Sequence, residues 1–292
     1  MTTGHEGHAH AERPLGDGVV RDVDAHGHQR AVPEQVASVR DGADGPADSA
    51  GVPWGGRELH SNPFAGDTGE ADPGLLEALR AVAAQPLEPQ RHQRVLSALA
   101  GARLYAPILP TVLEQTVDDR GLMHDNSSEM AMVRLTSGDG REATPAFTDI
   151  PALTAWHPDA RPVPIEAERL GAAAVEEGAQ LVVLDPGTPH TFLLRRPALW
   201  SFLQGLPWVP AWADAAVASA LRTATGEFGW ITGVGLGPAS RAVHAGGTEV
   251  RIEVRAAAAP TPQQSKQLQD ALAASAPLVE RIDSLALTFT QG

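Results

Sequence analysis

The chain has 292 residues, of which 42% are hydrophobic, enough to build the cores of about two ordinary domains. It carries 22 lysines and arginines against 36 acids, a formal net charge of −14, and Lys266 is its single lysine. No basic face is therefore expected to hold phosphates, which argues against nucleic acid as a partner. The chain has no cysteine, which excludes disulfides, thiolate nucleophiles and sulfur-ligated zinc sites.

The first 60 residues predict a disordered tail. They are rich in glycine, acids and histidine but hold few large apolar residues, too few to offset the entropy cost of ordering. His5, His8 and His10 are weak candidates for a loose metal site, but a solvated polar tail is the favoured interpretation because no scaffold fixes the ligand geometry. The chain starts without a cationic segment followed by an apolar one, and no run of about 18 apolar residues occurs. We therefore expect a cytoplasmic protein with no membrane partner.

Two helices and a strand are predicted to open the ordered region. Asp72 is suited to cap the first helix and Pro73 to occupy its first position, and apolar residues follow at helical spacing. Residues 90–100 repeat the apolar pattern. The run "RLYAPILPTVLE" (103–114) predicts a strand, whose two prolines place it nearer the edge of a sheet. Residues 114–128 predict a polar loop.

A β-hairpin is predicted around Asp139 and Gly140. The run "EMAMVRLTS" places Ala131, Val133 and Leu135 on one face of a single strand, "GDGR" forms the turn, and "EATPAFT" supplies the return strand. An Asp-Gly pair between two alternating runs is a strong hairpin signal. Asp139 is therefore interpreted first as a turn residue.

A helix is predicted to follow the hairpin over residues 149–156. Thr148 or Asp149 can cap it, and Pro151 suits its first turn. Turn and cap preferences explain the residue types at Asp139, Arg141, Thr148 and Asp149, so this polar run is interpreted mainly as local structure. Room remains for a binding loop.

Strands and helices alternate through the rest of the chain. The predicted elements are a strand at 161–165, a helix ended by Gly178, a buried strand at 179–187 with an Asp-Pro-Gly turn, a strand at 190–196, a helix from Pro197 to Gly205 that packs Leu199, Trp200 and Leu203, a linker at 206–212, a helix at 213–226, strands at 228–239 and 248–257, a helix at 261–280 and a strand at 282–290. The fold class is therefore α+β, with two small mixed domains at 61–205 and 213–292 behind the tail.

Three stretches carry a resemblance to a known family: "NPFAGDTGEADPGLLEAL", "VRLTSGDGREATPAFTDIPALTAWHPDARPVPI" and "GAQLVVLDPGTPHTFLLRRPALWSFLQG". Together, over residues 62–205, they resemble the N-terminal domain of the SseB (enhanced serine sensitivity) proteins of bacteria, in the form common in actinobacteria. Residues 212–290 resemble the smaller C-terminal domain of that family through less specific motifs. The resemblance implies no accepted reaction, cofactor or catalytic residue.

Catalytic and cofactor patterns find little support in the sequence. The run "GVGLG" lies within or just after one strand and is followed by another strand where a dinucleotide-binding helix would begin. No nucleophile elbow, phosphate-binding loop or H-E-x-x-H pair occurs. Asp185, His190 and Ser201 can be imagined as a relay, but separate structural roles are favoured because His190 opens a strand and Ser201 lies inside an apolar helix. No cofactor is expected.

Two classes of function therefore stay open. The favoured one is a non-catalytic protein-interaction or regulatory module with a protein partner, since two compact domains and an acidic tail suit contacts with a partner. Its candidate interaction residues are Asp139, Arg141, Phe147 and Asp149, which combine turn-forming polar groups with an apolar anchor. The alternative is an enzyme or a small-molecule sensor, related to amino acids, whose site is assembled from residues distant in sequence.

Overall fold

The computed structural model describes residues 21–23, 29–31, 64–110, 130–136 and 140–291. Before residue 64 it describes two short strands, β1 (Arg21–Val23) and β2 (Gln29–Ala31), which pair antiparallel. The rest of the tail lies outside the described residues, so its predicted disorder stays a prediction. From Gly66 onward the chain forms a separate compact unit. The α+β class is confirmed by the helices and sheets of this unit.

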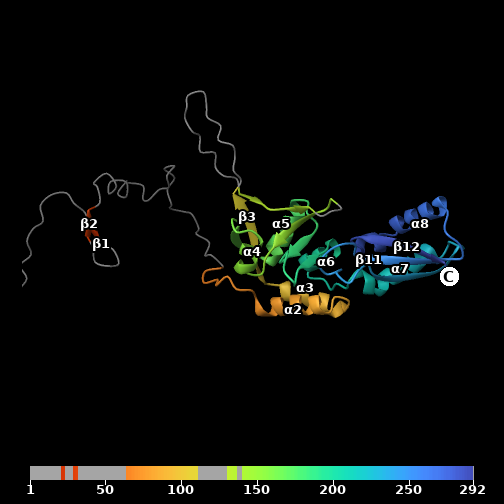
Figure 1. The fold of residues 1–292 in the computed structure, drawn as a ribbon, viewed down its shortest axis with the longest axis horizontal. Helices are drawn as coiled ribbons and strands as arrows, with labels where there is room; N and C mark the ends of the chain where they lie inside the picture. Colours follow the sequence, from red (N-terminus) through yellow and green to blue (C-terminus); the bar gives the residue numbers. More distant parts are fainter. Residues whose placement is uncertain (1–20, 24–28, 32–63, 111–129, 137–139, 292) are drawn as a thin grey trace, which may run out of the picture. The chain divides into compact units, whose positions relative to one another are not determined.

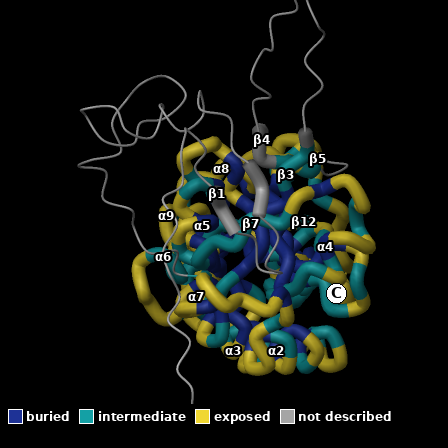
Figure 2. The backbone as a smooth tube through the Cα atoms, turned by 90° about the vertical axis from the view of Figure 1, so that its left-hand side faces the viewer, coloured by how far each residue is buried: buried dark blue, intermediate teal, exposed yellow. Residues whose placement is uncertain are grey.

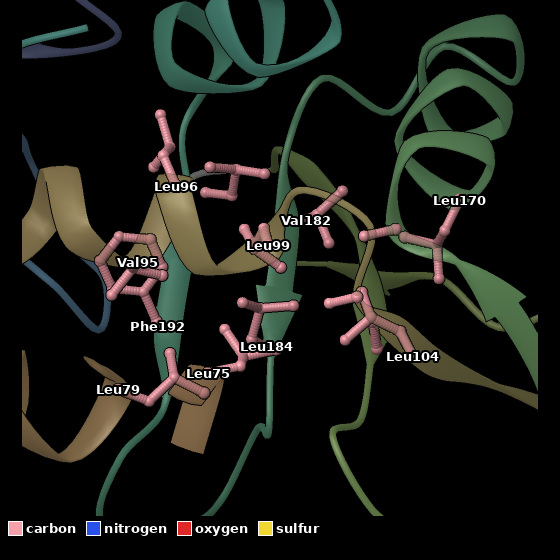
Figure 3. Close-up of a cluster of buried hydrophobic side chains, with 14 of the residues drawn as sticks. Leu75, Leu79, Val95, Leu96, Leu99, Leu104, Leu170, Val182, Leu184 and Phe192 are labelled. Carbon is pink, nitrogen blue, oxygen red and sulfur yellow. The ribbon is translucent and has the colours of Figure 1, made fainter. Parts of the chain in front are cut away.

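Two helices, α2 (Pro73–Ala84) and α3 (Pro89–Leu99), begin this unit close to their predicted positions. The Asp72 carboxylate accepts a hydrogen bond from the backbone N–H of Leu75 at 2.8 Å, which confirms the predicted N-cap. Both helices turn an apolar face toward the strands, and Figure 3 shows Leu79 and Val95 meeting Phe192 in this core. The apolar residues at helical spacing in α2 and α3 therefore form one buried face on each helix, as the sequence predicts.

Two sheets form the first half of the unit. The first has the antiparallel order β4 (Met130–Met132), β3 (Arg103–Pro110), β7 (Arg161–Glu166). The second has the order β5 (Leu135–Thr136), β6 (Glu142–Ala146), β8 (Val182–Leu184), β9 (Phe192–Leu194), in which only β6 and β8 are parallel. Tyr105 and Phe147 exchange two backbone hydrogen bonds of 2.8 and 3.0 Å, and so connect the two sheets.

The prediction that the proline-bearing strand lies near an edge is wrong, because β3 is the central strand of its sheet. Tyr105 directs its N–H and C=O away from β7, toward Phe147, and the direction alternates along a strand. Pro107 therefore also faces away from β7, and its pairing with Pro162 needs no N–H from either ring. On the other side, pairing with β4 begins only at Ile108. A proline is tolerated here because the position makes no ladder bond.

The predicted hairpin is present as the antiparallel pair β5 and β6. The strand expected to lead into it is divided, however: β4 pairs with β3, and β5 belongs to the other sheet. Asp139 lies outside the described residues. Gly140 has φ +82°, the left-handed region expected of a glycine in a tight turn.

Helices α4 (Ile150–Trp156), α5 (Ala167–Glu176) and α6 (Arg196–Leu203) complete the first half. Gly178 and Gly205, which follow α5 and α6, have φ of +83° and +64°, so the predicted glycine stops are confirmed. Leu170 of α5 points into the same core as Leu104 and Val182 in Figure 3. Figure 2 shows the buried residues in the middle of the unit and the exposed ones on its outer helices.

The second half has its own core and its own sheet. Its elements are η1 (Ala211–Ala213), α7 (Ala215–Thr225), β10 (Ile231–Pro238), β11 (Val250–Ala256), α8 (Pro262–Ala274), α9 (Ala276–Arg281) and β12 (Leu285–Gln291). The sheet has the order β10-β11-β12, in which β11 and β12 are parallel. Figure 1 labels β11 and β12 in this half, together with α7 and α8. Val250, Ile252 and Val254 pack with leucines of α7, α8 and α9.

One predicted helix of the second half is divided in two. The segment 261–280 contains α8 and α9, separated at Ser275, because Pro277 cannot continue the hydrogen bonds of α8 and instead occupies the first turn of α9. In the predicted linker, Trp208 packs against the core of the first half and Trp212 against the core of the second. The linker is therefore part of the packing between the halves. The domain boundaries themselves stay a prediction.

Candidate functional site

The predicted interaction residues that the structure describes take part in internal contacts. Phe147 is completely buried and its ring packs against Trp156, with centroids 5.3 Å apart. Asp149 caps α4 by accepting the N–H of Ala152 at 2.6 Å. Arg141 is half-buried, and its Nη1 lies 2.6 Å from Oδ2 of Asp283. Asp139 lies outside the described residues, as do the tail candidates for metal binding, His5, His8 and His10.

Asp185 and His190, two members of the imagined relay, do meet. The Asp185 side chain is fully buried, and His190 Nε2 lies 3.2 Å from its Oδ2. Thr148 donates its backbone N–H at 2.7 Å and its hydroxyl at 2.8 Å to the same carboxylate. The third member does not join them: Ser201 lies in α6 and lines two grooves elsewhere. Asp185 and His190 therefore lie in contact, although the sequence favours separate structural roles for them, and the three-residue relay is not assembled.

The Asp185 cluster has the chemistry of a structural clamp. Burial raises the pKa of the Asp185 carboxyl, and the two hydrogen bonds from Thr148 act in the opposite direction. Asp185 also has φ +46°, in the left-handed region, and its C=O accepts hydroxyl bonds from Thr188 and Thr191. The cluster thus holds the turn after β8 to the start of α4. Neither Asp185 nor His190 lines the larger grooves described below.

A second polar cluster joins the two halves. Arg195 is buried; its Nη1 lies 3.1 Å from Oδ2 of Asp283, the same oxygen that Arg141 contacts. Its Nη2 donates to the carbonyls of Val243, Gly246 and Gly247. Glu249 is also buried, which raises the pKa of its carboxyl, and it accepts the N–H of Asp283 at 2.8 Å. Arginines of the first half are therefore fixed to the backbone and a carboxylate of the second.

Two adjoining grooves form the candidate functional site. The first has a volume of about 690 Å³ and lies between α8, α9 and β12. The second has a volume of about 490 Å³ and lies between α6, the segment that follows it and α9. Arg196 lines both. The first groove is mainly apolar; its aliphatic and aromatic lining residues are Leu272, Ala273, Leu278, Val279, Ile282, Leu285, Leu287 and Phe289.

Exposed apolar side chains gather at these grooves. Six large hydrophobic residues are exposed in the described part of the chain, and five of them border the two grooves. We call these five the apolar face: Trp200, Leu206, Val279, Leu285 and Phe289. The prediction that Trp200 lies on the packed face of its helix is wrong, because its side chain is 44% exposed. Helix α6 has only eight residues, and Ala198 and Leu199 form its buried face.

The described residues contain neither a candidate metal site nor a candidate membrane-spanning helix. No group of three or more histidine, aspartate, glutamate or cysteine side chains there is arranged to hold a metal ion. Of the helices that the structure describes, none has the length and apolar character needed to cross a membrane.

Comparison with known proteins identifies part of the first half. Residues 75–201 match the family model described as the SseB protein N-terminal domain, so the resemblance predicted from the motifs is confirmed for these residues. No curated protein and no solved structure matches the chain. The match ends inside α6, and the likeness of the following residues to an SseB C-terminal domain stays a prediction.

Proposed function

We propose that this chain is a non-catalytic protein-binding or regulatory module of the SseB kind, and that it binds a protein partner through the apolar face. The observation that carries the proposal is that five of the six exposed large hydrophobic residues in the described ranges border two adjoining grooves. Scattered exposed hydrophobics are ordinary, but a gathering of them marks an interaction surface. In this proposal the second half is an SseB C-terminal domain, the form is the actinobacterial one, and the protein acts in the cytoplasm.

The composition of this surface supports a protein as the partner. It combines two aromatic side chains, Trp200 and Phe289, with Arg196, and these residue types carry much of the binding energy in protein interfaces. The surface differs from the hairpin region that the sequence favours. Phe147 supports the core there and Arg141 is engaged with Asp283, so neither offers a ready contact.

A small-molecule sensor or an enzyme is the second candidate, and the Asp185–His190 contact favours it. A buried carboxyl with a raised pKa beside a histidine is a common feature of functional sites. The two hydrogen bonds from Thr148 into this carboxylate, and its absence from the lining of the two grooves, favour the structural role instead.

The test compares two variants that remove exposed apolar groups from different places. Trp200→Ser combined with Leu206→Ser changes the second groove, whereas Leu87→Ser removes the one exposed large hydrophobic of the described ranges that lies outside the apolar face. We expect the double variant to lose a specific protein captured by the full chain from native lysate, with the melting temperature unchanged. The Leu87→Ser variant should retain that protein. Equal capture by both variants, or a metabolite turnover that Asp185→Asn abolishes, would overturn the proposal.

A further inference from the structure

The outer edge of β12 lacks the features that usually protect an edge strand. In the described part of the chain no strand pairs with this edge. Its sequence, LALTFTQ, has no charge and no proline. The opposite edge strand, β10, carries three glycines, an irregular register near Gly233 and a terminal Pro238. Exposed edges are commonly blunted by charge, proline or bulges, so β12 is the edge of this sheet that is suited to accept another strand.

The backbone direction of β12 relates this edge to the first groove. The N–H of Val250 donates to the C=O of Ser284 at 3.1 Å, so Ser284 faces β11. Because the direction alternates along a strand, the backbone groups of Leu285, Leu287 and Phe289 face outward. The side chains of these same three residues line the first groove. A strand added here would therefore place every second side chain in the groove.

A cation lies where β12 begins. The Arg196 guanidinium donates through Nη2 to the carbonyls of Val279 and Ile282, which leaves its other N–H groups for a further acceptor. Among the described residues, no carboxylate pairs with Arg196. The nearby Asp283 is shared by Arg141 and Arg195 and is almost completely buried. Asp283 also lines the groove, but its carboxylate is paired with these two arginines, so Arg196 is the cation that the groove lining offers to a further acceptor.

We propose that the first groove binds an extended, acidic peptide segment of the partner protein, which adds to the sheet as a strand antiparallel to β12. Apolar side chains of the peptide enter the groove, its main chain bonds to the outer edge of β12, and a carboxylate near its C-terminal end meets Arg196. In this direction the C-terminal end of the peptide lies beside the start of β12, near Arg196. This inference rests on the proposed function and names the chemistry of the partner.

A second copy of this chain fits the groove less well. Strand β12 carries no aspartate or glutamate to meet Arg196. An acidic segment of another protein brings the missing carboxylate to Arg196.

The test uses a synthetic peptide in which valine and threonine alternate and a glutamate stands near the C-terminal end, labelled with a fluorophore and titrated with the full chain. In an antiparallel pair, the peptide residue opposite Leu287 has its side chain on the same face of the sheet as Leu287, and its N–H points toward β12. The valines, whose side chains enter the groove, take these positions. N-methylation of the valines should therefore weaken binding by tenfold or more, roughly the loss of one or two hydrogen bonds. N-methylation of the threonines, whose N–H groups face solvent, should change it little.

The matched protein variants test the cation. Arg196→Gln should weaken peptide binding by about tenfold, since a charge-assisted hydrogen bond is replaced by a neutral one. Arg196→Lys should retain most of the binding, and Arg80→Gln, at an exposed position of α2, should retain all of it. Melting temperatures measured on the same samples separate a loss of binding from a loss of folding. The glutamine version of the peptide should reproduce the effect of Arg196→Gln.

Three outcomes would overturn this inference: absence of saturable peptide binding, equal effects of the two N-methylated peptides, or a sedimentation experiment in which the chain dimerises and the peptide does not dissociate it. The Trp200→Ser and Leu206→Ser test of the proposed function depends on the second groove. Loss of partner capture in that test together with absence of peptide binding would reject the peptide and keep the protein-binding module.

Discussion

The two halves of the compact unit use their polar and apolar residues in opposite ways. In the first half, which carries the SseB match, polar motif residues serve the fold: Asp149 caps a helix and Asp185 clamps a turn. In the second half, apolar residues such as Val279, Leu285 and Phe289 stay exposed beside a groove. The specific motifs of the first half thus largely mark the demands of local folding, whereas three of the five residues of the apolar face lie in the second half, where the sequence motifs are less specific.

The largest expected effect concerns the arginine that ties the halves together. Arg195→Met should reduce the free energy of unfolding by about 3–5 kcal/mol, because it leaves the buried Asp283 and three carbonyls with fewer partners. The measurement is urea unfolding followed by tryptophan fluorescence. Arg251→Met, which removes an exposed contact with Glu253, should cost less than about 1 kcal/mol. An Arg195→Met variant as stable as the unaltered chain would show that the contacts of Arg195 are not needed to join the halves.

A smaller effect is expected at His92, a buried residue of the first half whose ring lies 5.6 Å from that of Trp212 in the second. Burial lowers the pKa of His92 to about 4, although a hydrogen bond to the C=O of Pro86 opposes the shift. The unfolded chain therefore binds a proton at a higher pH than the folded one does. Stability should fall by about 2 kcal/mol between about pH 7 and pH 5 on account of this group.

The control for His92 is His92→Gln, whose stability should change less over the same pH range. Burial raises the pKa values of Asp185 and Glu249, and their contribution has the opposite sign: it is largest in acid and is lost as the pH rises through the folded pKa. The difference between the two chains isolates His92. Identical pH profiles would contradict the assignment and would place the acid sensitivity elsewhere.

The smallest effect tests the hairpin of the first half. Gly140 has φ +82°, and a Cβ added there would meet no atom within 4 Å. Gly140→Val should therefore destabilise the fold by about 1–2 kcal/mol through backbone strain alone, and Gly140→Asn should be nearly neutral because asparagine tolerates this region. Thermal unfolding of both variants provides the check. Equal losses would indicate a close contact of Gly140 that the backbone argument does not include.

Local signals predicted much of this fold. Asp72 and Asp149 were identifiable as caps, and Gly178 and Gly205 as stops, because each needs only its chain neighbours. The central position of β3 was not predictable, since it depends on the pairing of Pro107 with Pro162, far away in sequence.

The candidate site was harder to predict than the fold. Its grooves join α6 to α9 and β12, elements separated by about a quarter of the chain, and no motif links them. The contact between Asp185 and His190 was considered as part of a relay but not favoured, for a related reason. A residue beside a turn and one that opens a strand were each explained locally, whereas the structure brings their side chains to 3.2 Å at a turn where Asp185 has a positive φ.

The backbone exchange between Tyr105 and Phe147 has a consequence for how the first half opens. These two residues connect sheets whose other strands pair only within their own sheet in the described ranges. Their amide hydrogens are protected by the junction, since each donates across it. Deuterium enters at these two positions when the sheets separate, even while each sheet stays intact, so the two amides distinguish parting of the sheets from melting of either one.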